Sequence, residues 1–346
     1  MFRRKWSALP ADPAFPSDLK KLGYFINDKD EIRSIENPDY YFKYFISRNE
    51  RYNERQRFAF NQAIEEEIHT RLTALGLRKI LLPLGTTDPR QPHVPIFASR
   101  DMGADMDTAS RVQDPQGPPS RVVVIFGETA QDLGVIAHRV IGGPGGINQG
   151  SMVSVVSALL QQRASATDAQ PPGIILANTG QLLWWEPPKH NHLSGQDQDQ
   201  KQDQDQKQDQ VQLQKQEARA MTRVGFDSAP MRSAVHEGVL VDLDVAGGGG
   251  KNRVPGNGDI AEHVRYVFET VVPALVPAGA KLDVVAVGDA ADAVERYFDW
   301  GATWARWRDR IACFANVGGY YPSWEIKCEG FRRFLREVSC PFFLTL

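Results

Sequence analysis

Residues 281–294, KLDVVAVGDAADAV, decide the expected fold class of this 346-residue chain. Residues 282–287 form an apolar, valine-rich run without regular alternation, which is typical of a strand covered on both faces of a parallel sheet. The small residues 288–291 can make a tight turn, and helical spacing continues from there to Phe298. The stretch therefore predicts a buried strand that turns directly into a helix.

The turn in this stretch lacks the nucleophile that a hydrolase carries there. α/β-Hydrolases place G-x-S-x-G at such a turn, because small neighbours let the strained turn form and expose the serine hydroxyl. Here the serine position falls on Gly288, and G-x-S-x-G occurs nowhere else in the chain. Asp289 is an alternative nucleophile, although an exposed aspartate that caps the helix is the simpler interpretation. The sequence predicts a hydrolase-shaped scaffold without hydrolase chemistry.

The end of a second expected strand, residues 121–126, also argues against hydrolase chemistry. It leads into Gly127 and Glu128. Hydrolases use this turn to aim backbone amides at the oxyanion that forms during acyl transfer. Glu128 would put a negative charge where negative charge develops, so Gly127 and Glu128 form a degenerate oxyanion turn. With the degenerate elbow at Gly288 and Asp289, they are the expected site residues, and we predict no catalytic residue, no cofactor and no metal.

Strands and helices alternate through most of the chain. The pattern predicts strands at 94–98, 121–126, 173–178, 282–287 and 311–315, and helices at 49–75, 153–160, 259–276 and 290–298. In the helix 259–276, Asp259 and Glu262 resemble a capping box, and Phe268 lies in the apolar stripe. This order predicts an α/β fold: a three-layer α/β/α, α/β-hydrolase-like, mostly parallel sheet with helices on both faces, lacking the nucleophile serine.

Several smaller features have structural interpretations. Residues 23–35 predict a hairpin, and the aromatic cluster at 40–45 predicts core under the next helix rather than a base-stacking platform. Glu65 to Glu67 are expected on a solvated helix face. The glycine-rich residues 142–146 predict a structural turn, since the lysine of a phosphate loop is missing, although amides there could still hold an anion.

Histidines and cysteines give weak signals for a metal site or a disulfide framework. His190 and His192 have no third ligand nearby, and His236 and His263 fit buried, hydrogen-bonded histidines. The three cysteines lack C-x-x-C spacing, which favours a reducing compartment over a disulfide framework. A net charge of −3 disfavours general electrostatic binding to nucleic acid.

The expected domain organisation is a leader at residues 1–18 and one domain at 19–346. Residues 195–217 interrupt the domain, with glutamine at every even position from 196 to 216. Such a segment has almost nothing to bury, so we expect a disordered Gln/Asp-rich insert. No apolar run approaches the roughly 20 residues that span a membrane, and no signal-peptide core follows the basic start. The expected location is the nucleus, the cytoplasm or both.

Long stretches of the chain resemble the Argonaute-binding protein two (Arb-two) domain family, and its stand-alone fungal members in particular. The resemblance covers nearly the whole chain and rests on residues 1–60, on 121–156 (RVVVIFGETAQDLGVIAHRVIGGPGGINQGSMVSVV), on 174–185 (IILANTGQLLWW) and on 253–269 (RVPGNGDIAEHVRYVFE). It implies an α/β-hydrolase-like fold and a role in RNA-mediated gene silencing. In that family one branch works with Argonaute and small RNA in heterochromatin formation.

The resemblance leaves three functions to compare. The first is a non-catalytic scaffold, a pseudo-hydrolase, that binds Argonaute, with small RNA held indirectly and no membrane contact. The second is histone binding, as in the related C-terminal part of class II histone deacetylases. The third is an esterase-like hydrolase with a displaced nucleophile. The missing elbow serine favours the first, so we predict that the protein is not an enzyme.

Overall fold

The computed structural model describes six parts of the chain: residues 13–99, 117–184, 231–232, 240–241, 252–319 and 324–338. The chain divides into two compact units, Met1–Trp184 with Val254–Leu346, and Trp185–Arg253. In the smaller unit the described residues include an antiparallel pair, β7 (Met231–Arg232) and β8 (Leu240–Val241). The larger unit contains the sheet and the candidate site. Within the described residues, no helix has the length and apolarity of a membrane-spanning segment.

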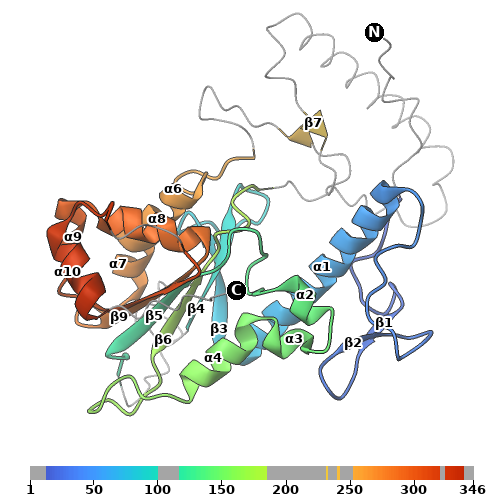
Figure 1. Cartoon of the computed structure of the whole chain (residues 1–346), viewed down its shortest axis with the longest axis horizontal. Coiled ribbons are helices and arrows are strands. Elements are labelled where there is room, and N and C mark those ends of the chain that lie inside the picture. Colours follow the sequence, from blue (N-terminus) through green and yellow to red (C-terminus); the bar gives the residue numbers. More distant parts are fainter. Residues whose placement is uncertain are drawn as a thin grey trace, which may run out of the picture. The chain divides into compact units, whose positions relative to one another are not determined.

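Six strands in the described part of the larger unit form one mixed sheet (Figure 1). They are β3 (Leu77–Leu82), β4 (Val94–Ser99), β5 (Arg121–Phe126), β6 (Gly173–Ala177), β9 (Lys281–Val287) and β10 (Ile311–Val317). Their order across the sheet is β10-β9-β5-β6-β4-β3. The pairings from β10 to β6 are parallel, whereas β4 is antiparallel to both of its neighbours. The predicted α/β class and mostly parallel sheet are confirmed.

Alternate residues of the central strands face two separate cores. On β5, Val122, Val124 and Phe126 face the first core, and Val123 and Ile125 face the second. Because both faces of the strand are covered, its sequence is continuously apolar rather than alternating. The helices that follow residue 259 cover the first face, and those before residue 161 cover the second (Figure 1). The helices predicted on both faces are therefore present.

One long helix packs across the first face. It comprises α6 (Ile260–Tyr266), a π-helical segment η2 (Val267–Val271) and α7 (Val272–Leu275). The wide π turns directly precede Pro273, which has no amide hydrogen to give to the preceding turn. Asp259 Oδ1 accepts a hydrogen bond from the Glu262 amide at 2.8 Å, and Glu262 Oε2 accepts one from the Gly258 amide at 2.9 Å. The predicted capping pair is confirmed, and Phe268 is fully buried as expected.

Three further helices complete this layer: α8 (Asp289–Phe298), α9 (Gly301–Trp307) and α10 (Glu329–Glu337). They meet in an aromatic cluster, in which Trp304 lies 5.0 Å from Phe331 and 6.0 Å from Phe298, measured between ring centroids. These large buried rings join α8, α9 and α10 in one part of the first core.

The second face is covered by α1 (Glu50–Ala74), α2 (His138–Ile141), α3 (Gly146–Gln149) and α4 (Met152–Leu160). The N-cap of α1 is Asn49, whose side chain accepts from the Arg51 amide, and Gly76 follows its C-cap with φ of +93°. The predicted hairpin is present as β1 (Tyr24–Ile26) and β2 (Ile32–Ser34).

Some predictions were wrong or incomplete. Within the 40–45 cluster, Phe42 stacks on Phe60 at 4.0 Å, but Tyr40 and Phe45 are exposed. Strand β3 and helices α9 and α10 were not predicted. The Gln/Asp-rich insert, the four glycines at 247–250, and His190, His192 and His236 lie outside the described residues.

Candidate functional site

The turn between β9 and α8 has a backbone shape that only glycine adopts easily. Gly288 has φ of +56° and ψ of −133°, and its amide donates to the Val317 carbonyl at 2.9 Å. Ala290 and Ala291, which follow it, are fully buried. A side chain at position 288 would therefore stand at a sharp strand-to-helix turn, as the nucleophile does in a hydrolase elbow. At this position the chain has no side chain.

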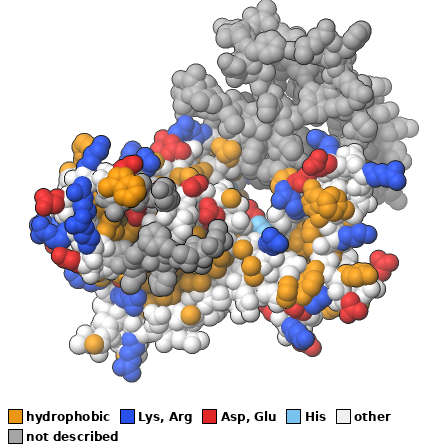
Figure 2. Space-filling view, viewed as in Figure 1, with side chains coloured by type: hydrophobic (Ala, Val, Ile, Leu, Met, Phe, Trp, Pro, Cys, Tyr) orange, Lys and Arg blue, Asp and Glu red, His pale blue; other side chains and the backbone are white. Residues whose placement is uncertain are grey.

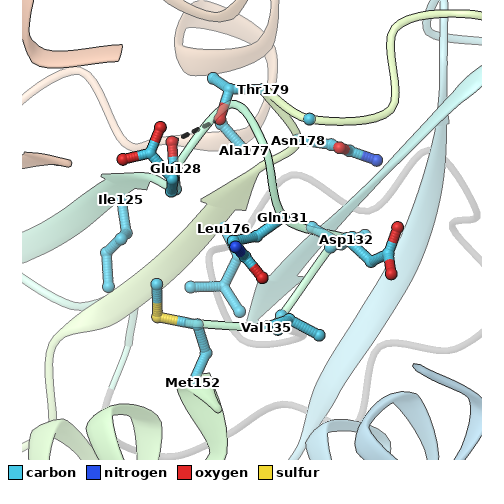
Figure 3. Close-up of a pocket in the computed structure, with 14 residues that line it drawn as sticks. Ile125, Glu128, Gln131, Asp132, Val135, Met152, Leu176, Ala177, Asn178 and Thr179 are labelled. Atoms are coloured by element: carbon cyan, nitrogen blue, oxygen red, sulfur yellow. Dashed lines mark hydrogen bonds between the residues drawn. The ribbon is translucent and has the colours of Figure 1, made fainter. Parts of the chain in front are cut away.

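The Glu128 carboxylate occupies the space that a side chain at position 288 would need. A Cβ atom built on Gly288 would overlap with the Glu128 carboxylate. Glu128 Oε1 accepts hydrogen bonds from the Thr129 amide at 2.8 Å and from Thr129 Oγ1 at 3.1 Å. In Figure 3 the Glu128 carboxylate points away from Asp132 and Val135. Glu128 and Gly288, separated by 160 residues in the sequence, therefore lie in direct contact.

The structure also places the other two predicted site residues. Asp289 is exposed, and its Oδ2 lies 3.4 Å from Thr129 Oγ1, but the N-cap of α8 is Gly288, so the predicted capping role is wrong. Gly127 presents its carbonyl, which accepts from Thr179 Oγ1 at 2.5 Å. This bond ties the turn after β5 to the loop after β6.

These four residues lie where ligands usually bind in open α/β sheets. The chain leaves β5 toward β6 on one side, and leaves β9 toward β10 on the other. The carboxyl ends of β5 and β9 therefore form a topological switch point, the usual crevice for a ligand. The cavity lined by Gly127, Glu128, Gln131 and Asn178 measures only about 10 Å³ (Figure 3). That is about the space of one water molecule.

A buried acid lies behind the elbow, on α8. Glu295 is 5% exposed, and its Oε1 accepts from Asn316 Nδ2 at 2.9 Å on β10. Its Oε2 has no hydrogen-bond partner in the described structure. Desolvation by burial raises the pKa of Glu295 to about 7, against the opposing effect of the Asn316 hydrogen bond. This carboxyl group was not singled out from the sequence.

A second polar network lies between α1 and the loops that follow β5 and β6. Gln181 Nε2 donates to Glu65 Oε1 at 2.9 Å and to Asp132 Oδ1 at 3.2 Å, and so bridges two carboxylates. His138 Nε2 lies 2.8 Å from the other oxygen of Asp132. Desolvation raises the pKa of Glu65 to about 7. The prediction that Glu65 lies on a solvated face is wrong, because the loops cover it.

His69 and Lys79 complete this network. His69 Nε2 lies 3.0 Å from the Leu133 carbonyl and its Nδ1 lies 2.8 Å from Lys79 Nζ, which fits a neutral ring protonated at Nε2. Desolvation and Lys79 lower the pKa of His69 to about 4. The 3.6 Å contact with Glu65 is therefore not an ion pair at neutral pH.

The anion at the glycine-rich turn is a carboxylate of the same chain, that of Asp30. Asp30 Oδ2 accepts from the Asn148 amide at 2.7 Å, and the Asp30 carbonyl accepts from the Ile147 amide at 3.0 Å. Arg71 Nη1 lies 2.7 Å from Asp30 Oδ1. The β1–β2 turn thus fills the amides at the start of α3, and the expected structural role of the turn is confirmed.

Metal ligation has no geometric support in the described structure. Within those residues, no group of three His, Cys, Asp or Glu side chains has the arrangement to hold a metal ion. His263 is fully buried. Its Nδ1 pairs with Asn257 Oδ1 at 2.7 Å, while its Nε2 has no partner among the described residues. Desolvation lowers the pKa of His263 to about 3, so the ring is neutral.

Comparison with known protein families decides the relationship. A model of the Arb2 domain matches residues 15–345, nearly the whole chain. The chain belongs to the Arb2 domain family. The resemblance found in the sequence is thereby confirmed, and the chain is an Argonaute-binding-type domain in broad terms. No curated protein and no solved structure matches it.

Proposed function

We propose that this Arb2 domain is a non-catalytic scaffold that binds an Argonaute protein and acts in small-RNA-directed heterochromatin silencing. The match to the Arb2 domain over residues 15–345 carries the proposal, since Argonaute association is what the family is named for. On this proposal, the protein is located in the nucleus, the cytoplasm or both.

The proposed architecture is that of an α/β-hydrolase without its nucleophile. Two observations support it: a mostly parallel sheet, and a positive-φ turn between the central strand β9 and helix α8. At that turn Gly288 has no hydroxyl, and the Glu128 carboxylate fills the space beside it. A fixed negative charge there would repel the oxyanion of acyl transfer.

Co-precipitation with Argonaute tests the scaffold role. Tagged full-length protein, expressed in its native cells, should bring down Argonaute both before and after ribonuclease treatment. Contacts between proteins should persist as salt rises, whereas direct phosphate contacts weaken steeply. Association that disappears with ribonuclease would contradict direct protein contact, and no association in either case would contradict the proposed function. Recovery of histones without Argonaute would favour the related histone-binding role.

A reactivity assay tests the absence of catalysis. The purified protein should neither react with a fluorophosphonate probe nor hydrolyse short-chain esters, because position 288 offers no nucleophile. A known serine hydrolase serves as the positive control. Stoichiometric labelling of one serine, lost when that serine alone is replaced by alanine, would show that the hydrolase alternative is correct.

A further inference from the structure

Two exposed tryptophans distinguish one end of the larger unit. Trp300 is 70% exposed and Trp324 is 75% exposed, although Trp304 and Trp307 on the same layer are buried. An exposed tryptophan leaves a large apolar ring in water, and tryptophan is enriched among the residues that dominate protein–protein binding energy. The pair is therefore the strongest signal for an interaction surface among the described residues.

Hydrogen bonds fix the backbone around both tryptophans. Asp299, which ends α8 and precedes Trp300, accepts from the amides of Lys327 and Cys328 through its Oδ1, each at 2.7 Å. The same bonds tie down the segment that carries Trp324. Ile326, two residues after Trp324, is 1% exposed and anchors this segment in the core. Because these contacts hold Asp299 and residues 326–328 in place, that part of the backbone would lose little conformational entropy on binding.

The two rings are close enough to serve one partner. Trp300 is adjacent to Asp299, and Trp324 lies three residues before Lys327, which Asp299 binds. Chain geometry then keeps the two Cα atoms within roughly 20 Å of each other. An interface of ordinary size, about 800 Å² on each partner, covers such a distance.

The charges around the tryptophans indicate what kind of partner fits. Figure 2 shows Lys and Arg side chains gathered on the end formed by α9 and α10. Exposed Arg306, Lys327 and Arg336 form no ion pair with another described residue. Exposed Glu325 and Glu337 interrupt this positive charge. A continuous phosphate backbone would meet these carboxylates, whereas a protein surface can place opposite charges against both signs.

We propose that Trp300 and Trp324 anchor the protein partner of this domain, each indole entering an apolar socket whose rim is mainly acidic. The inference rests on the proposed function, because the partner tested is Argonaute. It adds the surface that makes the contact, which the family match does not identify.

Paired substitutions in the full chain test this surface. The double variant Trp300→Ala, Trp324→Ala should keep the thermal stability of the wild type, because both rings are exposed, and should bind purified Argonaute at least about tenfold more weakly. The matched control is Tyr40→Ala, Phe45→Ala, which removes two rings of 65% and 74% exposure on another part of the chain. It should bind within about twofold of the wild type.

The possible results of this binding experiment test the tryptophan surface and the proposed function separately. If the tryptophan variant binds Argonaute as tightly as the wild type does, the proposed surface is wrong and the scaffold role still stands. No binding by the wild type would overturn both. Equal weakening by the control variant would also overturn the surface. Wild-type binding abolished by ribonuclease, or tryptophan-dependent dimers in light scattering, would show that RNA or a second copy of the chain occupies the surface instead.

Discussion

Gly288 and Glu128 meet at the turn between β9 and α8, where the proposed pseudo-hydrolase would lack its nucleophile. The elbow torsion angles put residue 288 in the left-handed region, where a residue with a Cβ atom is strained. The carboxylate of Glu128 lies over the glycine and is held there by Thr129. Restoring a hydroxyl at 288 would therefore require a change at 128 as well.

A double-mutant cycle tests this coupling. Gly288→Ser should destabilise the fold by about 1–2 kcal/mol through backbone strain alone, and further through overlap with Glu128. In a Glu128→Ala background the overlap is gone, so the same substitution should cost at least about 1 kcal/mol less. Denaturant unfolding measures both values. Gly279→Ser, which meets no atom within 4 Å, is the control and should be nearly neutral.

Equal costs of Gly288→Ser in the two backgrounds would show that the Glu128 carboxylate does not occupy the elbow in solution. The cycle therefore tests the central geometric observation of the site without any assay for activity.

At the scale of the helix and strand, the segment α6–η2–α7 over β9 is the centre of the first core. Phe268 lies within 6 Å of four other aromatic rings, those of Phe126, Tyr297, Phe298 and Trp307, measured between centroids. It lies in the π-helical segment η2 and is fully buried. The helix therefore depends on packing much more than on its cap.

Phe268→Ala should lower the free energy of unfolding by about 3–5 kcal/mol, since it removes a fully buried ring. Glu262→Ala removes one side-chain hydrogen bond to the Gly258 amide and should cost about 0.5–2 kcal/mol. Chemical denaturation with both variants measures the difference. Equal, small costs would mean that Phe268 is not in the core.

The elements predicted from the sequence are those whose own residues carry a complete pattern. Strand β5 is apolar throughout because both of its faces are covered, and α1 has apolar residues at helical spacing with a cap at each end. Strand β3 was missed because Arg78 and Lys79 interrupt its apolar residues. Its burial comes from the long-range pairing with β4, which local sequence does not specify.

Some features of the candidate site were also predictable from the sequence, and others were not. The elbow and the strand end were predictable, because each is a contiguous motif. The contact between Glu128 and Gly288 and the burial of Glu65 under Gln181 depend on loops distant in the sequence. Glu65 follows helical spacing on the polar side of α1, so only the folded loops show that it is buried.

At the scale of the whole molecule, buried titrating groups make stability depend on pH in two opposite directions. Glu65 and Glu295 have pKa values raised to about 7, so the stability that goes with their protonated forms is complete at low pH and is lost as pH rises through 7. His69 and His263 have lowered pKa values, about 4 and about 3, so their contribution is lost as pH falls from about 6.5. The two opposite slopes cancel between about pH 4.5 and 6.5, so stability should be greatest in that range.

The substitution Glu65→Gln tests how much Glu65 contributes to the pH dependence of stability. The folded protein disfavours the Glu65 carboxylate, so the neutral glutamine should raise the free energy of unfolding at pH 8, by at most roughly 3 kcal/mol for a shift from 4.5 to about 7. At pH 5 the carboxyl group is protonated in the fold and the pH is only slightly above the unfolded pKa of 4.5, so most of this gain should be gone. Thermal unfolding at the two pH values measures the gain.

Glu66→Gln is the control, because it makes the same charge change at an exposed neighbour and should have little effect on stability at either pH. A gain at pH 8 no larger than the gain at pH 5 would mean that Glu65 is solvated, and that the loops after β5 and β6 do not close over α1.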